Sequence, residues 1–477
     1  MNKPTAKWIA PTFLTGLLLL PVCAVICERG LFLPGGILFI LVGIALYISF
    51  YFSRKNLVHP VALLSLFWIG GIGVAGLKLS NLSADHWSIL TWVSLLGFYY
   101  LFLAGYLIVE KLSERKKKRT EPSISPLFAE HRKEEEYDGV RKRLMICIIG
   151  MCAVSAAAFL FEAAWLGFIP ALIKDTPHAY SEFHVTGVHY FTVSSCFVHP
   201  LTLLYLYRMT KGDRRKIRDL LKNKTYWFLV LVNIVAILIP ILCVSRFFLI
   251  MSVALTLVTF LSIKKNVSGK TLLVLGILCI FILIPGYILL TVFRSHSVEY
   301  LNGIFDMKNR DMPIFITQPY MYIANNFENF NCLVTQFSQF SLGRRILFPA
   351  VALTGLKFVY PDFVPGVLYL TKEELTTLTL VYDAYYDFGV AGVLVFGGVL
   401  GVAAKIVESV CLKNRNPIAY LFYAQIAMYL VLSFFTTWFS NPTTWFWLVI
   451  TGMMYLFVGY EKRKKQEEPK EEEKAHV

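Results

Sequence analysis

Four arginine residues lie beside or between apolar runs, where burial of a charged side chain is energetically unfavourable. Arg246 separates two apolar runs that have almost no loop between them, Arg294 follows the next apolar run, and Arg344 and Arg345 come later as a pair. A guanidinium group donates bidentate hydrogen bonds and stays charged at any relevant pH, which suits a phosphate or diphosphate. A charge held at membrane depth is a functional candidate, although Arg246 could also be a turn residue that extends its charge to the membrane surface. The four residues indicate an anionic ligand.

A second group mixes amides, aromatic rings and one carboxylate. Residues 322–331 read Tyr-Ile-Ala-Asn-Asn-Phe-Glu-Asn-Phe-Asn, so Asn325, Asn326, Glu328 and Asn329 lie within five positions of the chain. Aromatic rings of this kind can stack on sugar faces while amides hydrogen-bond hydroxyl groups. A satisfied polar cap on a helical bundle explains the same pattern equally well.

A third group precedes a glycine-rich apolar run and contains Tyr382, Asp383, Tyr385, Tyr386 and Asp387. A carboxylate at a helix start is stabilised by the helix dipole, so Asp387 fits a capping role as well as a chemical one. A carboxylate or imidazole can also act as a general base towards a hydroxyl group. The residues that remain open for that role are Glu328, Asp383, Asp387, Glu162, His184 and His199.

Apolar runs must position these residues. Of the 477 residues, 56% are hydrophobic and only 16% are charged, which excludes a water-soluble surface. Runs of about 17 to 25 apolar residues match the length that crosses a bilayer as a helix. We therefore predict an all-α polytopic membrane protein, with residues 1–461 forming one integral membrane domain. The twelve expected spans are 8–27, 33–52, 58–77, 87–109, 144–168, 189–207, 227–245, 247–263, 271–292, 388–410, 417–438 and 445–460.

The basic residues set the expected topology. The net charge of +15 would suggest nucleic acid in a soluble protein, but the basic residues concentrate in segments 110–143 and 208–226 between apolar runs. The positive-inside rule makes these segments cytoplasmic loops and places both termini in the cytoplasm, which leaves 35 of the 46 Lys and Arg residues inside. Residues 293–387 then form one large extracytoplasmic loop whose apolar parts dip into or lie on the membrane. Residues 462–477 form a charged cytoplasmic tail that we expect to be disordered.

Several reaction classes have no sequence motif here. The sequence contains no P-loop, no H-E-x-x-H pair, no G-x-S-x-G elbow and no paired Cys or His pattern. We therefore expect no metal, no bound cofactor and no nucleic acid partner.

The third group resembles a signature of bacterial oligosaccharide repeat-unit polymerases, the Wzy-type enzymes of O-antigen, capsule and exopolysaccharide assembly. Residues 376–389 and the glycine-rich run 390–404 are similar to the family's Asn-Thr-Phe-Thr...Tyr-x-Asp-Phe-Gly string, with Thr376 in the place of Asn. The Asn-Phe-Glu-Asn run, the Gly-Phe-Ile-Pro element at 167–170 and the lone Arg246 follow the family's order. The loop 174–189 lacks the Arg often found there, so the resemblance assigns it no role. The similarity spans roughly residues 140–460.

The resemblance implies a multi-pass enzyme of the bacterial cytoplasmic membrane with a GT-C-like glycosyltransferase architecture. Such an enzyme transfers a growing glycan from undecaprenyl diphosphate to a lipid-linked repeat unit at the outer face, without a nucleotide sugar. A chain-length-regulating co-polymerase and a flippase are possible partners. The alternatives are an O-antigen ligase-like transferase and a flippase or exporter of lipid-linked oligosaccharide. A flippase would suit internal repeats, and the two halves of the chain show none.

The topology is tested by labelling single cysteines in intact cells with a membrane-impermeant reagent. Cysteines placed at positions 120, 220 and 470 should stay unlabelled because they lie in cytoplasmic segments, while one placed at Asn309 should react. Labelling of position 220 from outside would contradict the orientation. It would also contradict the assignment of every residue named above to the outer face.

Overall fold

The computed structural model describes residues 3–117, 134–173, 179–210, 222–264, 267–271, 273–278 and 298–459. Arg294, the tail 462–477 and most of the expected span 271–292 lie outside these residues, as do the central parts of both basic loops. The expectations made for those segments therefore stay predictions.

Within the described ranges the chain is helical, and its one β-type pairing is an isolated bridge between Ser80 and Met307. The helices before residue 220 are α1 (Lys3–Glu28), α2 (Phe32–Arg54), α3 (Pro60–Leu64), the π-helical turn η1 (Ser65–Ile69), α4 (Gly70–Gly76), α5 (Ile89–Lys117), α6 (Glu134–Leu166), α7 (Ala179–Glu182), α8 (His189–Val193), the 3₁₀ turn η4 (Ser194–Phe197) and α9 (Val198–Thr210). Those after it are α11 (Lys224–Leu242), α12 (Arg246–Ile263), α14 (Val298–Phe305), α15 (Ile314–Gln336), α16 (Arg344–Leu353), the 3₁₀ turn η5 (Leu356–Phe358), α17 (Tyr382–Cys411), α18 (Ile418–Val431), the 3₁₀ turn η7 (Trp438–Ser440) and α19 (Pro442–Gly459).

Seven described helices are long and apolar enough to cross a bilayer: α2, α5, α6, α11, α12, α17 and α19. Shorter apolar helices occupy Thr12–Glu28, Pro60–Gly76 and Ile418–Val431, where three more of the twelve expected spans were placed. The expected span 189–207 is divided into α8, η4 and α9. The chain is thus an all-α, multi-pass membrane protein, as the sequence predicted.

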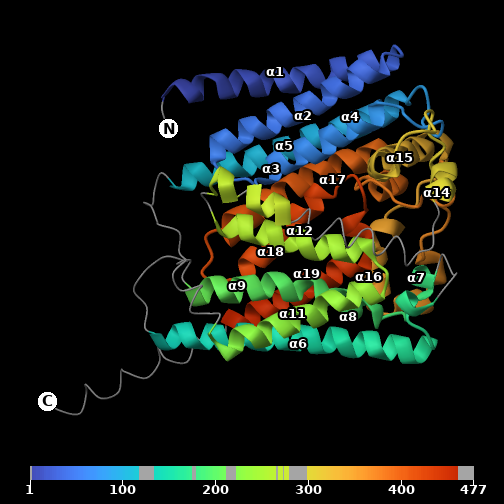
Figure 1. Cartoon of the computed structure of the whole chain (residues 1–477). Helices are drawn as coiled ribbons and strands as arrows, with labels where there is room; N and C mark the ends of the chain where they lie inside the picture. The colour runs from blue at the N-terminus through green and yellow to red at the C-terminus, as the bar shows by residue number, and fades with distance from the viewer. Residues whose placement is uncertain are drawn as a thin grey trace, which may run out of the picture.

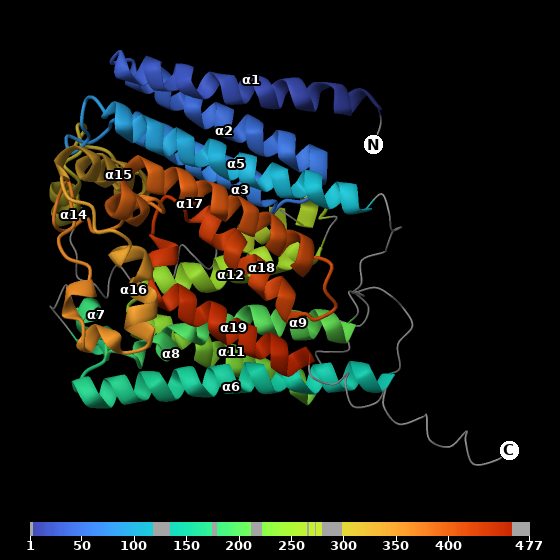
Figure 2. The same cartoon turned by 180° about the vertical axis from the view of Figure 1, so that it is seen from behind.

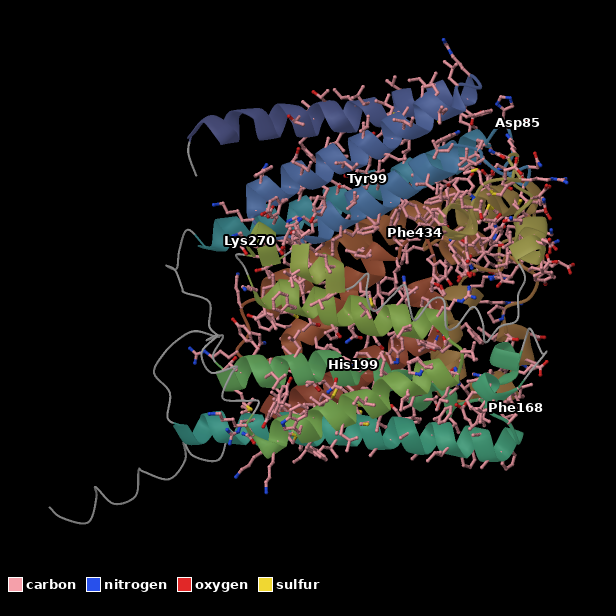
Figure 3. The ribbon with its side chains drawn as sticks, in the orientation of Figure 1. Asp85, Tyr99, Phe168, His199, Lys270 and Phe434 are labelled. Atoms are coloured by element: carbon pink, nitrogen blue, oxygen red, sulfur yellow. The ribbon has the colours of Figure 1, made fainter. Side chains whose placement is uncertain are left out.

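The helices run roughly parallel, as Figure 1 shows. One end of the bundle carries α7, α14, α15 and α16, and we call it the loop end; it lies on the right in Figure 1 and on the left in Figure 2. The other end, where α1 begins, we call the opposite end. In Figure 3, Asp85 and Phe168 lie at the loop end, Lys270 lies towards the opposite end and His199 lies between the two.

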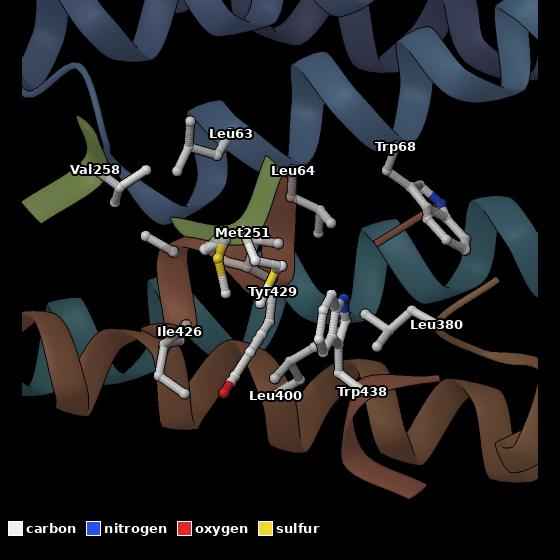
Figure 4. Close-up of a cluster of buried hydrophobic side chains, with 14 of the residues drawn as sticks. Leu63, Leu64, Trp68, Met251, Val258, Leu380, Leu400, Ile426, Tyr429 and Trp438 are labelled. Carbon is white, nitrogen blue, oxygen red and sulfur yellow. The ribbon is translucent and has the colours of Figure 1, made fainter. Parts of the chain in front are cut away.

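Helices α5 and α17 approach each other closely through glycines. A Cβ atom added at Gly401 would lie 2.0 Å from the carbonyl oxygen of Phe102, and one at Gly105 would lie 2.3 Å from that of Gly398. Small residues of this kind let helix backbones meet, which is how helices pack where lipid offers no hydrophobic driving force. A buried apolar cluster adjoins this contact and includes Trp68, Leu400 and Trp438 (Figure 4).

A network of ionisable side chains ties α2, α5 and α17 together near the opposite end. Glu110 accepts from Arg54 at 2.7 Å and from Lys405 at 3.1 Å, and Lys405 also donates to Glu408 at 2.8 Å. Tyr106 donates to Glu408 and lies 2.9 Å from Nε2 of His59. Each buried charge in the network therefore has an oppositely charged neighbour, as burial in a bundle demands.

The glycine contact predicts the effect of one added methyl group. Gly401→Ala should lower the free energy of unfolding by roughly 1–3 kcal/mol, because the new Cβ would overlap the Phe102 carbonyl and force the helices apart. The matched control is Gly452→Ala in α19, where no atom lies within 4 Å of the added Cβ. Thermal melts of the detergent-purified protein compare the two, and equal melting temperatures for Gly401→Ala and the native chain would contradict the predicted overlap.

Candidate functional site

Glu328, one of the expected bases, lies at the loop end in α15 and is held by three donors. Its Oε1 accepts from Lys78 at 2.6 Å, and its Oε2 accepts from the indole of Trp87 at 2.9 Å and from the backbone N–H of Ala84 at 3.2 Å. The Lys78 ammonium also lies 4.3 Å from the centre of the Trp87 ring. Glu328 is 2% exposed. The carboxylate therefore fastens the segment between α4 and α5 onto α15, and this geometry favours a structural role.

The neighbouring amides fix a second segment. Asn329 donates to the carbonyl oxygens of Leu375 and Thr377 at 2.8 and 3.0 Å and accepts from the backbone N–H of Thr371 at 2.8 Å. The Thr371 hydroxyl donates to Asn325 and that of Thr377 to Asn326. These contacts hold the chain ahead of α17 against α15. These contacts fit the polar-cap interpretation for Asn329, whereas Nδ2 of Asn325 is buried and has no hydrogen-bond partner among the described residues.

Arg345 and the two aspartates of the third group form a buried clasp. Arg345 donates from Nη1 to Asp383 at 3.0 Å and from Nη2 to the Val367 carbonyl at 3.0 Å, and its guanidinium lies 3.7 Å from the Tyr386 ring centre. Asp387 accepts from the backbone N–H groups of Arg345 and Ile346 at 3.2 and 2.9 Å. Asp387 is therefore a helix cap, but it caps α16 and not the helix in which it lies. Arg344, the first residue of α16, is exposed.

The tyrosines of this group pack into the protein. The Tyr382 hydroxyl lies 2.8 Å from the backbone nitrogen of Tyr369, and the Tyr385 ring meets Phe330 edge-on at 5.5 Å. Helix α17 then breaks at Gly389, whose φ of +62° is readily adopted only by glycine. The break lets residues 382–388 turn towards α16 before the apolar part of α17 begins.

An irregular segment, residues 432–441, joins α18 to α19 beside this clasp. Its Ser433 carbonyl accepts from the backbone N–H of Leu380 at 2.8 Å, and the side chains of Thr437 and Ser440 lie near Asp383. Phe434, from the same segment, lies within the bundle (Figure 3). Non-helical backbone at membrane depth is tolerated only where protein shields it, and these contacts supply the shielding. They also explain why α18 ends seven residues before the expected end of its span.

A different group of residues offers a carboxylate next to an imidazole. Glu162, near the loop end of α6, is fully buried and lies 3.1 and 3.2 Å from Nδ1 of His189. It also accepts from the Thr192 hydroxyl at 2.6 Å and the backbone N–H of Val185 at 2.9 Å. His184 meets the His189 ring edge-on at 4.9 Å. Burial lowers the pKa of His184, and the neighbouring His189 lowers it further.

Arg246 lies two residues before Phe248, which contacts this group. It begins α12, is 7% exposed and follows Ser245, whose hydroxyl caps the helix by accepting from the N–H of Phe248. The Phe248 ring meets His189 edge-on at 6.2 Å, and the Phe247 ring stacks on Trp438 of η7 at 5.9 Å. Arg246 therefore lies at the loop end, between the Glu162–His189 pair and the irregular segment. It is buried, and this placement does not match a surface turn residue.

The expected site residues thus separate into distinct environments. The sequence named Glu162 and His184 as possible bases, yet it gave no reason to pair Glu162 with His189. The remaining candidate, His199 (labelled in Figure 3), is a partly buried residue of α9, and its Nδ1 lies 2.7 Å from Oδ1 of Asn233 in α11. Among the described residues no three His, Cys, Asp or Glu side chains gather as metal ligands do.

The Lys78–Glu328 pair predicts a stability effect that depends on which partner is removed. Glu328→Leu or Lys78→Met alone should destabilise the protein by about 3–5 kcal/mol, because each leaves one buried charge without its partner. The double variant should recover most of that loss. A double-mutant cycle on thermal unfolding in detergent measures the coupling, and additive single effects would show that the pair is not coupled.

Comparisons with known proteins identify no relative of this chain. No protein-family model matches it, and no curated protein or solved structure is similar to it at a significant level. Any functional assignment therefore depends on the residues and the geometry described above.

Proposed function

We propose that this protein polymerises undecaprenyl diphosphate-linked oligosaccharide repeat units at the outer face of the bacterial cytoplasmic membrane. In this proposal the chain crosses the membrane twelve times in a GT-C-like arrangement, both termini are cytoplasmic and the loop end faces outwards. The product is an O-antigen, capsular polysaccharide or exopolysaccharide. A co-polymerase and a flippase are its proposed partners.

Arg246 is the observation that carries the proposal. Its guanidinium group is buried at the start of α12. The next two residues of that helix contact His189, through Phe248, and Trp438 of the irregular segment, through Phe247. In glycosyl transfer from a lipid diphosphate, negative charge develops on the leaving group. A fixed guanidinium in a poorly hydrated site stabilises that charge without reorganisation.

The resemblance of residues 376–389 to the polymerase signature supports the same assignment. In this chain those residues build the Arg345–Asp383–Asp387 clasp, which holds α16 against the start of α17. The clasp therefore positions the loop end in the proposal, and the reacting groups lie elsewhere. A ligase-like transferase would use the same donor with another acceptor, and a flippase would move the lipid without lengthening its glycan.

A reconstitution experiment separates these three functions. Purified protein in liposomes that contain only undecaprenyl diphosphate-linked repeat units should produce a ladder of longer glycans, with one undecaprenyl diphosphate released per linkage. No ATP or nucleotide sugar should be needed. Translocation between leaflets at unchanged length would support a flippase. Transfer only after a second acceptor is supplied would support a ligase.

Arg246→Ala should reduce the rate of polymer formation by about 10²-fold or more, since it removes charge stabilisation from the transition state. Arg246→Lys should restore little, because a point charge does not reproduce the planar fork. The matched control is Arg310→Ala, an exposed arginine beyond α14 at the loop end, which should leave the ladder unchanged. A full ladder from Arg246→Ala, at normal abundance in the membrane, would remove Arg246 from the proposed mechanism.

A further inference from the structure

We infer that His189, oriented by Glu162, accepts the proton of the acceptor hydroxyl during glycosyl transfer. This inference depends on the proposed polymerase function and assigns one step of that reaction to a particular side chain. The two residues, Glu162 and His189, are adjacent in the structure, and the sequence gave no indication of this contact.

The geometry fixes which ring nitrogen is available. Both Glu162 oxygens lie within 3.2 Å of Nδ1, and an ionised carboxylate only accepts hydrogen bonds, so Nδ1 carries the proton. The unprotonated nitrogen is then Nε2, on the opposite side of the ring. The His189 side chain is 19% exposed whereas that of Glu162 is 0% exposed, so the imidazole is the partly exposed member of the pair. A buried carboxylate that holds an imidazole in one tautomer is the arrangement that makes histidine an effective base.

The carboxylates expected as bases are placed differently. Glu328 accepts from three protein donors, Asp387 accepts from two backbone N–H groups, and Asp383 pairs with Arg345. A hydroxyl group of a substrate would have to displace those donors before its proton could move. Nε2 of His189 needs no such displacement.

The surroundings of His189 suit a neutral base that becomes charged during reaction. Glu162 stabilises the imidazolium once the proton has arrived. His184, the nearest other imidazole, is shifted by burial towards its neutral form and so adds no positive charge beside His189. The ionisable groups around the Glu162–His189 pair are His184 from the loop before α8, Cys243 from the α11–α12 turn and, through His184, Lys357 from η5. Arg246 begins α12, whose Phe248 ring contacts His189.

The step balances as a substitution at the sugar. The acceptor hydroxyl oxygen forms a bond to the anomeric carbon of the donor glycan while the bond from that carbon to the diphosphate oxygen breaks. The diphosphate leaves with the bonding electron pair, next to Arg246. The hydroxyl proton passes to Nε2 of His189 and is later released to water. No oxidant, reductant or metal takes part.

The first test removes the imidazole from the reconstituted enzyme. His189→Ala should lower kcat by about 10²-fold or more, the usual contribution of a general base, with a smaller change in KM for the lipid-linked repeat. Added imidazole should restore part of the rate, which a purely structural defect would not permit. The matched control is His86→Ala, since His86 also lies 3.1 Å from a glutamate, Glu28, at the loop end but is mostly exposed. The control should retain the native rate.

The second test asks whether Glu162 acts through His189. Glu162→Gln should lower kcat in the native background but have little further effect in His189→Ala, because two residues that act as a unit are not additive. His189→Gln serves in place of His189→Ala should the smaller residue reduce the amount of folded protein.

The possible outcomes distinguish a failure of the His189 assignment from a failure of the proposed polymerase function. No ladder from the native protein would defeat the polymerase function itself. A native ladder together with an unchanged rate in both His189 variants would defeat only the assignment of His189. Loss of rate without imidazole rescue, and with additive effects of Glu162→Gln, would give the pair a structural role and also overturn the inference.

Discussion

The ion pair between Arg345 and Asp383 controls how the loop end is built. Both side chains are buried, and a buried charge that loses its partner costs several kcal/mol. The pair therefore holds α16 against the start of α17, and the segment 432–441 lies beside it, with the Thr437 and Ser440 side chains near Asp383. Gly389 makes this possible by letting α17 turn away from its own axis. A continuous helix would carry Asp383 out of reach.

Buried polar groups need hydrogen-bond partners, and the polar residues of the loop end meet this need in two ways. Glu328, Asn329 and Asp387 form hydrogen bonds with backbone and side-chain groups of adjacent segments, which makes them rigid supports. Glu162 accepts hydrogen bonds from His189 and Thr192. Since it binds the imidazole through Nδ1, the second ring nitrogen, Nε2, is left for a bound molecule. A rigid support that surrounds a partly exposed reactive group is the arrangement that preorganised sites use.

The sequence predicted the fold class well because hydropathy alone decides it. Seven of the expected spans coincide with long apolar helices, whereas the span 189–207 is divided and α18 ends before its expected span does. The polar-cap interpretation of residues 322–331 was one of the two stated. The sequence could not show that Asp387 caps α16, since that contact joins a helix start to residues more than forty positions earlier. The sequence could not show the pairing of Glu162 with His189 either, because that contact also joins residues that are far apart in the chain. An isolated Glu in an apolar run gives no sign of the helix that will face it.

The network near the opposite end has a consequence for the protein in an energised membrane. Arg54 and Lys405 carry two positive charges, and Glu110 and Glu408 carry two negative charges, so their formal sum is zero. One uncompensated charge moved across a potential of 100 mV changes in energy by about 2.3 kcal/mol. Four charges that sum to zero experience almost no net force from the membrane potential. The packing of α2, α5 and α17 therefore stays insensitive to voltage. This network can thus carry ionised groups in the bundle without itself responding to voltage.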